Sequence, residues 1–203
     1  SIDDVRIYNR VLTSGEVYKL YYKPEGNLTI TNLISGTDKN LPVAHYKLDE
    51  SSGTVALDST GNNYHGTNIG ATVTAAGYDG TNNGAYSFDG SNDYILISEK
   101  FQTPKFTVSF WANAVDDGDS SSSHSTISNR YHDSLTAHGW NFYTPIGNTG
   151  YWQFWIGIGT SATWSTISTS SAVSYNEWHH VVGTYDGTIC LLYTSPSPRD
   201  SVV

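Results

Sequence analysis

Cysteine is almost absent from this chain, because Cys190 is the only one. A disulfide framework needs at least two cysteines, so internal cross-links are excluded as a source of stability. Methionine is missing altogether, which predicts that the sequence does not begin at a translation start and is a fragment of a longer protein. No apolar run approaches the ~18 residues that a membrane-spanning helix needs.

Positive charge is also scarce. The chain has 10 lysines and arginines against 19 aspartates and glutamates, which gives a formal net charge of -9. Nucleic-acid binding needs clustered basic side chains, and those of this chain are scattered, so that class of partner is disfavoured. An acidic surface is compatible instead with calcium and with neutral glycans.

Aromatic residues, by contrast, are abundant. They make up 13% of the chain, with 15 tyrosines and 6 tryptophans, and 19 glycines accompany them. Together with many serines, threonines and asparagines, this composition is typical of β-strands joined by polar turns. A mean hydropathy of -0.37 predicts a folded domain rather than a disordered chain. The composition is also typical of secreted bacterial proteins, and we therefore expect an extracellular or cell-surface location.

The first 22 residues predict one strand and one helix. Residues 2–8, "IDDVRIY", alternate between apolar and polar side chains, as a strand does. Thr13 and Glu16 have the spacing of a capping box, so a helix is expected from there to about Tyr21. Lys23-Pro24 ends this helix, and residues 23–41 form the expected linker.

Residues 42–189 carry a series of strand patterns separated by turn residues. The segment 139–160, "GWNFYTPIGNTGYWQFWIGIGT", predicts a hairpin with its tip at Gly147-Asn148-Thr149-Gly150. Short strands between polar turns favour a β-sandwich or jelly roll. One strand places four apolar side chains on a single face: Phe106, Val108, Phe110 and Ala112.

Four of these blocks resemble, in order, the blocks of a laminin G-like, concanavalin A-like jelly-roll domain. They are "VAHYKLDESSGTVALDSTGNNYHGT", "GAYSFDGSNDYILIS", "FTVSFWANA" and "NEWHHVVGTYDGT". The resemblance covers residues 42–189. Residues 1–22 resemble the closing strand and helix of the same kind of domain. The chain is therefore interpreted as the end of one repeat, a linker at 23–41, and most of a second repeat.

This resemblance implies an all-β fold, a two-sheet antiparallel jelly-roll sandwich truncated at its C-terminal end. It also implies a non-catalytic carbohydrate-binding or adhesion module, secreted or on a bacterial cell surface, which acts beside other domains of one polypeptide. Two alternatives stay open, because one sandwich serves many roles. They are a structural spacer without a ligand and a fragment related to the glucanases.

The second repeat lacks its own closing strand in this sequence. A sandwich without that strand exposes unpaired backbone groups and an apolar slot, which favours addition of a strand. Residues 2–9 are a strand of the right type, and the linker can extend to roughly 60 Å. We therefore predict that residues 2–9 dock in the vacant slot, with a helix at 14–21 beside them.

Catalysis is not expected. Glucanases of this fold carry alternating carboxylates, Glu-x-Asp-x-(x)-Glu, on one strand, and hydrolysis needs two carboxylates across the scissile bond. None of the glutamates of this chain lies in that pattern. Asp116, Asp117 and Asp119 are close in sequence, but they lie in a serine-rich loop and indicate a solvated turn.

A calcium site is predicted in the loop that follows residue 57. Calcium prefers carboxylate, amide and carbonyl oxygens from flexible loops, and the resemblance implies calcium in loops of this kind. Asp58 and Asn62 are the candidate ligands, together with backbone carbonyls, and the ion is expected to be structural. The alternative is that Asp58 only shapes the loop through turn hydrogen bonds. Asp89 and Asp93 are weaker candidates, for which turn formation is the better interpretation.

A ligand platform is predicted on the hairpin. Sugars stack on aromatic rings, and amide groups bond their hydroxyls. The alternative interpretation is that a long loop at 115–139 covers Trp155, so that no platform is open. The candidate residues share one face of the predicted hairpin, opposite the core: Trp155, Tyr151, Gln153, Tyr143 and Asn141.

The last 14 residues, 190–203, do not match the pattern of the rest. "CLLYTSPSPRD" resembles the translation of a transposase-based sequencing adapter, and the base before that adapter fits an Ile codon at Ile189. We therefore predict that residues 190–203 are not native. Sequencing of the native locus tests this origin: the reading frame should diverge after Ile189, and a genome that encodes the same residues in place would refute it.

Overall fold

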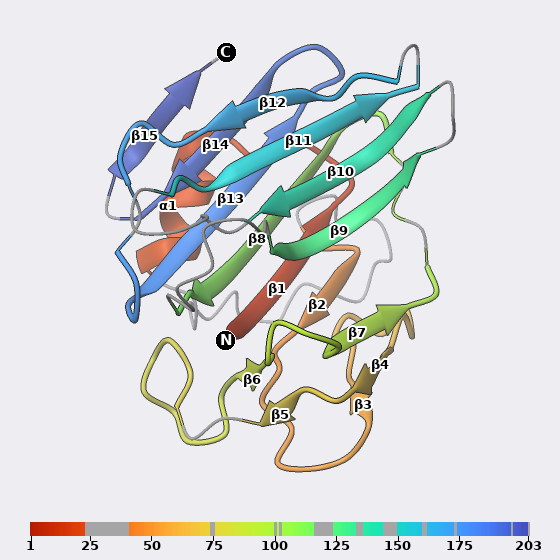
Figure 1. Ribbon diagram of the computed structural model, residues 1–203, viewed down its shortest axis with the longest axis vertical. Helices are drawn as coiled ribbons and strands as arrows, with labels where there is room; N and C mark the ends of the chain where they lie inside the picture. Colours follow the sequence, from red (N-terminus) through yellow and green to blue (C-terminus); the bar gives the residue numbers. More distant parts are fainter. Residues whose placement is uncertain are drawn as a thin grey trace.

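In the residues that it describes, the computed structural model shows a β-rich fold of three antiparallel sheets and one helix, α1 (Ser14–Tyr22) (Figure 1). The side chains of residues 131, 132 and 197–202 lie outside the description. The expected linker, apart from residue 41, also lies outside the described residues, which are 1–22, 41–73, 76–99, 101, 103–115, 124–132, 136–143, 150–159, 162–172, 174–195 and 197–202.

One layer of the fold is an eight-stranded sheet, which we call the main sheet. Its strands run in the order β15-β14-β13-β8-β1-β6-β5, and β2 also pairs with β1. The strands are β1 (Ile2–Tyr8), β2 (Ala44–Tyr46), β5 (Thr72–Val73), β6 (Tyr86–Ser87), β8 (Phe106–Asn113), β13 (Trp178–Tyr185), β14 (Cys190–Thr194) and β15 (Ser197–Val202).

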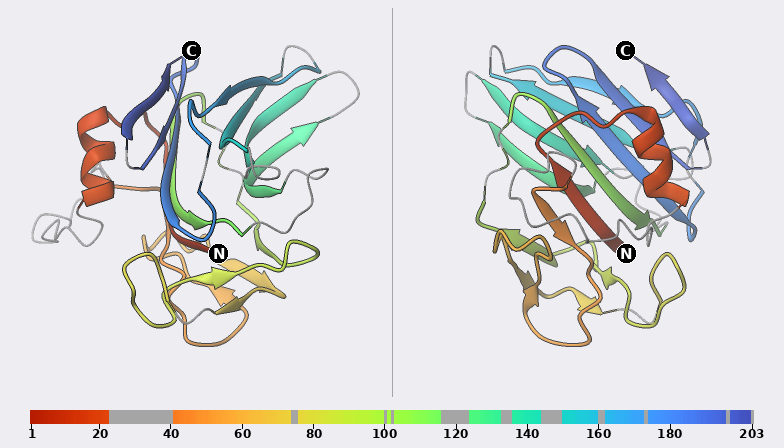
Figure 2. Two further views of the ribbon diagram at one scale, coloured as in Figure 1. Left: turned by 60° about the vertical axis from the view of Figure 1, so that its left-hand side comes forward. Right: turned by 180° about the vertical axis from the view of Figure 1, so that it is seen from behind.

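The other layer consists of two shorter sheets. The facing sheet has the order β12-β11-β10-β9 and lies opposite the main sheet (Figure 2), and the small sheet has the order β3-β4-β7. This arrangement confirms an all-β antiparallel sandwich, with its second layer divided in two. The strands are β9 (Ser125–His132), β10 (Ala137–Tyr143), β11 (Gln153–Ile158), β12 (Ser165–Ser168), β3 (Val55–Ala56), β4 (Gly66–Ile69) and β7 (Tyr94–Ile97).

The core lies between the main sheet and the facing sheet. All four apolar residues predicted on one face of β8 are buried in it, as the alternation indicated. Phe142 and Phe154 from the facing sheet stack with their ring centroids 4.5 Å apart. They approach Gly183 of β13 so closely that a Cβ there would collide with Phe142. A glycine at this position therefore sets how closely the two sheets pack.

Helix α1 covers the outer face of the main sheet. Its capping box forms as predicted: the Thr13 backbone N–H donates to the Glu16 carboxylate over 2.8 Å, and the Glu16 N–H donates to the Thr13 hydroxyl over 3.3 Å. Val17 from the helix packs with Tyr8, Val182 and other residues in a second apolar cluster. Both faces of the main sheet are consequently buried around β8 and β13, and Figure 2 shows the helix outside the sheet.

Strand β1 docks between strands of residues 42–189, so that part of the sequence prediction is confirmed. It pairs antiparallel with β8, where Ile7 faces Val108, and with β2, where Ile7 faces Ala44. A buried cluster locks the pairing: the Asp4 carboxylate lies 2.6 Å from the His45 ring and 3.0 Å from the Arg6 guanidinium. The proposed origin of β1 in a preceding repeat stays a prediction.

Residues 190–194 form strand β14 on the edge of β13. Leu192 is completely buried in the main core, and Tyr193 packs in the cluster beneath α1. A run of apolar and β-favouring residues fits this position whatever its origin. The adapter origin of residues 190–203 therefore stays a prediction.

The prediction of a long loop at 115–139 was wrong for most of the residues described there. Ser125–His132 form β9, and Ala137 begins β10, which pairs with it. Of the remainder, 116–123 and 133–135 lie outside the described residues.

Ile158, which the alternation of β11 places on the core face, is 56% exposed because β11 extends beyond the core there.

Asp3 and His180 are two of the buried titratable groups of the main sheet. Asp3 is 4% exposed, and burial raises its pKa to about 7, although its carboxylate accepts a hydrogen bond from the Tyr78 N–H. Burial lowers the pKa of His180 to about 3, and its ring lies 2.8 Å from the Ser109 hydroxyl. Desolvation disfavours the charged form in both cases.

The raised pKa of Asp3 predicts a specific pH dependence. Between pH values of about 4 and 7 the folded state holds a proton that the unfolded state has lost, so the Asp3 contribution to stability falls as pH rises and levels off above pH 7. The Asp3→Asn variant keeps an oxygen for the Tyr78 N–H and does not titrate. We expect it to gain stability relative to the wild type across this window, by up to about 4 kcal/mol.

Urea unfolding of both proteins at several pH values between 4 and 8 measures this difference. The comparison removes the contribution of His180, which both proteins share and which runs the other way in the overlapping range. A difference in unfolding free energy that is constant over the range would contradict the assignment to Asp3.

Candidate functional site on the outer face of the facing sheet

The hairpin of β10 and β11 has one face in the core and one face away from it. Trp140, Phe142, Phe154 and Ile156 are core residues. The residues between them therefore lie on the outer face, where Asn141 pairs with Trp155 and Tyr143 pairs with Gln153. The two strands of the predicted hairpin thus pair, and these four candidates share one face. Of the predicted tip at 147–150, only Gly150 is among the described residues.

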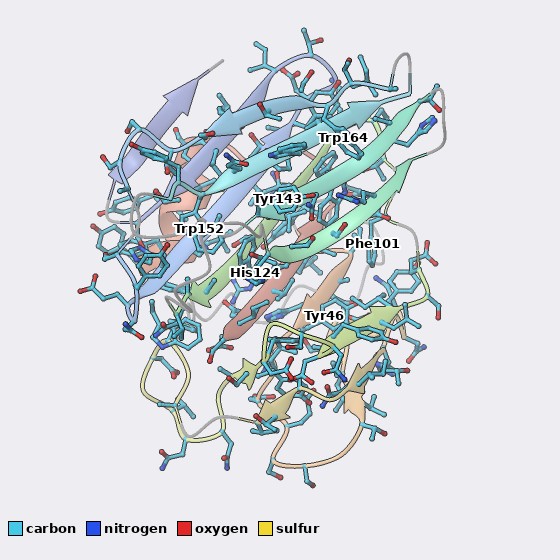
Figure 3. The ribbon with its side chains drawn as sticks, in the orientation of Figure 1. Tyr46, Phe101, His124, Tyr143, Trp152 and Trp164 are labelled. Atoms are coloured by element: carbon cyan, nitrogen blue, oxygen red, sulfur yellow. The ribbon has the colours of Figure 1, made fainter. Side chains whose placement is uncertain are left out.

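Tyr143 and Trp155 are the centre of this face. Their ring centroids are 5.1 Å apart, and the rings meet edge to face at 68°. The Trp155 indole N–H donates to the Gln153 side-chain oxygen over 3.0 Å, and Arg130 donates to the Tyr143 hydroxyl. We call Tyr143, Gln153, Trp155 and Arg130 the aromatic platform; Figure 3 labels Tyr143 on the facing sheet.

The candidates differ in how far they reach solvent. Tyr151, which precedes β11, is 43% exposed, whereas Tyr143, Gln153 and Trp155 are partly buried. Asn141 is only 1% exposed, and its side-chain oxygen accepts a hydrogen bond from Ser125. Asn141 is therefore positioned beneath the surface and supports the platform rather than facing a ligand.

Arg130 was missed by the sequence interpretation. It lies on β9, pairs with Gly139 of β10 and reaches Tyr143 across the strand pair. Nothing in its local sequence marks it, because its position follows only from the register of β9 on β10. The same register bears on the covering loop, because residues 137–143 pair with β11 and residues 125–132 form the next strand beyond them in the facing sheet.

Asp58 is surrounded by hydrogen-bond donors. Its carboxylate accepts from the backbone N–H groups of His45, Thr60 and Tyr64, over 3.1, 3.0 and 3.2 Å, and from the Thr60 hydroxyl. Burial alone would raise the pKa of Asp58, but these hydrogen bonds outweigh it and hold the pKa below its usual range. The contacts support the alternative that Asp58 shapes its loop.

The other metal candidates also have local partners. The Asn62 amide donates to the Val43 carbonyl over 2.9 Å. Asp89 accepts from the N–H groups of Ser91 and Asn92, and Asp93 accepts from the Asp89 N–H, as turn formation requires. Across the described part of the chain, no group of three or more His, Cys, Asp or Glu residues could hold a metal ion. Calcium at Asp58 and Asn62 stays a prediction.

A family model described as Concanavalin A-like lectin/glucanases superfamily, of laminin G type, matches residues 89–195. The match covers more than half of the 203 residues and includes β7 to β14, and thus the whole aromatic platform. Searches of curated proteins and of solved structures find no match. Within the described residues, the helix is too short and too polar to cross a membrane.

The fold and this match agree. The matched residues form the facing sheet and the strands β8, β13 and β14 of the main sheet, which pack as two antiparallel layers. The chain belongs to the concanavalin A-like lectin/glucanase superfamily.

Proposed function

We propose that this chain is a non-catalytic carbohydrate-binding module, and that its ligand lies across the aromatic platform. The module would belong to an extracellular, multidomain bacterial protein. The observation that carries the proposal is the edge-to-face pair of Tyr143 and Trp155, which is partly open on the outer face of the facing sheet. The superfamily assignment supports a carbohydrate-binding type of module.

The platform provides the two interactions that sugars use. The apolar face of a pyranose ring packs on aromatic rings such as Trp155 and Tyr151. Sugar hydroxyls need donors and acceptors nearby, and the Gln153 amide and the Arg130 guanidinium are already aligned beside the rings. Because the chain carries a net charge of -9, neutral glycans fit it better than anionic glycans.

The carboxylates needed for hydrolysis are missing from the strands of this site. β9, β10, β11 and β12 contain no aspartate or glutamate. A glycosidase of the usual kind holds two carboxyl groups about 5–10 Å apart across the scissile bond. The strands that form the platform therefore favour binding without catalysis.

The alternative from another class is a structural spacer, whose aromatic residues serve only packing and solubility. Partial burial of Tyr143 and Trp155 fits both functions. The two differ in whether a glycan binds, and in whether binding depends on Trp155.

Replacement of Trp155 tests the platform directly. We expect the Trp155→Ala variant to lose glycan binding by about tenfold or more, because the stacking surface and the hydrogen bond to Gln153 are both removed. A glycan array identifies the ligand, and titration calorimetry of the full chain then measures the affinity. Tyr22→Ala is the matched control, since Tyr22 is a 57% exposed aromatic residue on α1.

Two outcomes would contradict the proposal. One is that the full chain binds no glycan on the array, which favours the spacer. The other is that Trp155→Ala and Tyr22→Ala bind as tightly as the wild type, which places the ligand elsewhere.

Calcium is a separate proposal for the Asp58 loop, and its role there would be structural. A ligand that binds only the folded state raises stability by mass action. Asp58→Ala should lower the free energy of unfolding by about 2 kcal/mol or more, because the three backbone donors lose their acceptor. If calcium binds, EDTA also lowers the melting temperature of the wild type and leaves that of Asp58→Ala unchanged. Melting of the wild type that is unaffected by EDTA would overturn calcium binding.

A further inference from the structure

A cavity of about 1150 Å³ lies between the small sheet, the facing sheet and the main sheet. Its walls are β7 and β9, and its floor includes Val5 and Ile7 of β1 and Tyr46 of β2. Figure 1 shows where β7, β9, β1 and β2 lie in the fold, and Figure 3 labels three lining residues, Tyr46, Phe101 and His124. We call this space the interstrand cleft.

Both walls of the interstrand cleft are edge strands. In the described part of the chain, β7 pairs only with β4, and β9 pairs only with β10. Consecutive residues of each strand, 94–98 and 125–130, line the cleft. The second edge of each strand therefore turns toward the cleft, with backbone donors and acceptors available for another strand.

The floor and walls expose apolar surface to this space. Ile95, Ile97 and Ile127 pack against the main core but are only partly buried, and so are Phe88 and Phe101. All five line the cleft. A further apolar side chain in the cleft would complete their burial, at about 25 cal/mol per Å² of apolar area removed from water.

Unsatisfied polar atoms lie at the same wall. The Trp140 indole nitrogen, the Asn129 amide nitrogen and the Thr126 hydroxyl are buried and have no hydrogen-bond partner among the described residues. Trp140 is 3% exposed. A buried donor without an acceptor is costly, so these atoms also indicate that the cleft receives a polar group such as a carbonyl.

The rim of the cleft is acidic. Asp89, Asp93 and Glu99 line it, and Arg130 is the cationic side chain opposite them, already engaged with Tyr143. The charge at the opening therefore favours an occupant that carries lysine or arginine.

We propose that an extended segment of a partner polypeptide docks between β7 and β9 as an additional strand. Its apolar side chains, at alternate positions, reach the floor of the interstrand cleft, and the positions between them point outward and include basic residues. A ladder of antiparallel hydrogen bonds repeats every two residues, about 6.8 Å. A polypeptide matches that repeat on both open edges, whereas a sugar chain does not.

Docking of this strand would join the small sheet and the facing sheet into one continuous sheet. The proposal does not depend on glycan binding, and the cleft shares only Arg130 with the aromatic platform. It uses the mode of recognition in which main-chain hydrogen bonds supply affinity and alternate side chains supply specificity.

The experiment measures binding of an eight-residue peptide, acetyl-KVTIKVTI-amide, to the full chain by calorimetry. Acetyl-KTVIKTIV-amide has the same composition but lacks the alternation. A third peptide keeps the first sequence and carries N-methyl groups at alternate residues, which removes the donors on one edge. We expect the first peptide to bind, and the other two to bind at least tenfold more weakly.

Two variants place the peptide in the cleft. Ile127→Lys puts a charge on the wall and should weaken binding at least tenfold, whereas Thr166→Lys, an exposed residue of β12, should not. Hydrogen exchange of the wild type gives a readout that does not depend on variant folding. Bound peptide should protect amides of β7 and β9, and those of β12 should exchange as before.

Three results would overturn the proposal. No binding of the first peptide at about 1 mM is the first. Equal affinity of the N-methylated peptide is the second, because it excludes strand pairing. The third is that the peptide binds but amide exchange in β7 and β9 is not slowed. Displacement of such a peptide by a neutral oligosaccharide would place it on another surface.

Discussion

The main sheet depends on the backbone hydrogen bonds of β1. β8 pairs with one side of this strand, and β2 and β6 pair with its other side, so within the described residues strand pairing joins these three strands only through β1. The pairing is specific because Asp4, Arg6 and His45 form a buried polar cluster that a shift of one residue would break. α1 then follows directly and covers the sheet from outside. The first 22 residues thus hold together strands that lie far apart in the chain.

Residues with strong periodicity or turn chemistry could be placed from the sequence. The alternation of β8, the capping box of α1 and the hairpin of β10 and β11 are local signals, and all three appear in the structure. β9 could not be placed, because Ser125–His132 contains only Ile127 and Tyr131 as large apolar or aromatic residues. The hydrogen bonds of its pairing with β10 hold β9 as a strand, although its own sequence has little apolar periodicity.

The aromatic platform was predictable only in part, for a similar reason. The period of two puts Tyr143, Gln153 and Trp155 on one face, whatever lies beside them. The burial of Asn141 and the approach of Arg130 depend on β9, so neither follows from the hairpin alone. Asp58 shows why a metal site is hard to predict from sequence. The carboxylate and amide oxygens of a loop can bind a metal ion, or they can accept hydrogen bonds from the backbone N–H groups of that loop. Both kinds of loop have the same sequence pattern.

The position of β1 also has a consequence for synthesis on the ribosome. Ile7 pairs with Val108, so β1 emerges about 100 residues before β8, which completes its pairing, a delay of roughly 5–20 s at ordinary elongation rates. During that time a strand with one apolar face is exposed to other nascent chains. Asp3 and Asp4 lie within it and are charged as long as it is solvated, which discourages association of such strands. The Asp3 carboxylate, whose charge is costly to bury in the finished sheet, therefore protects the strand before the sheet exists.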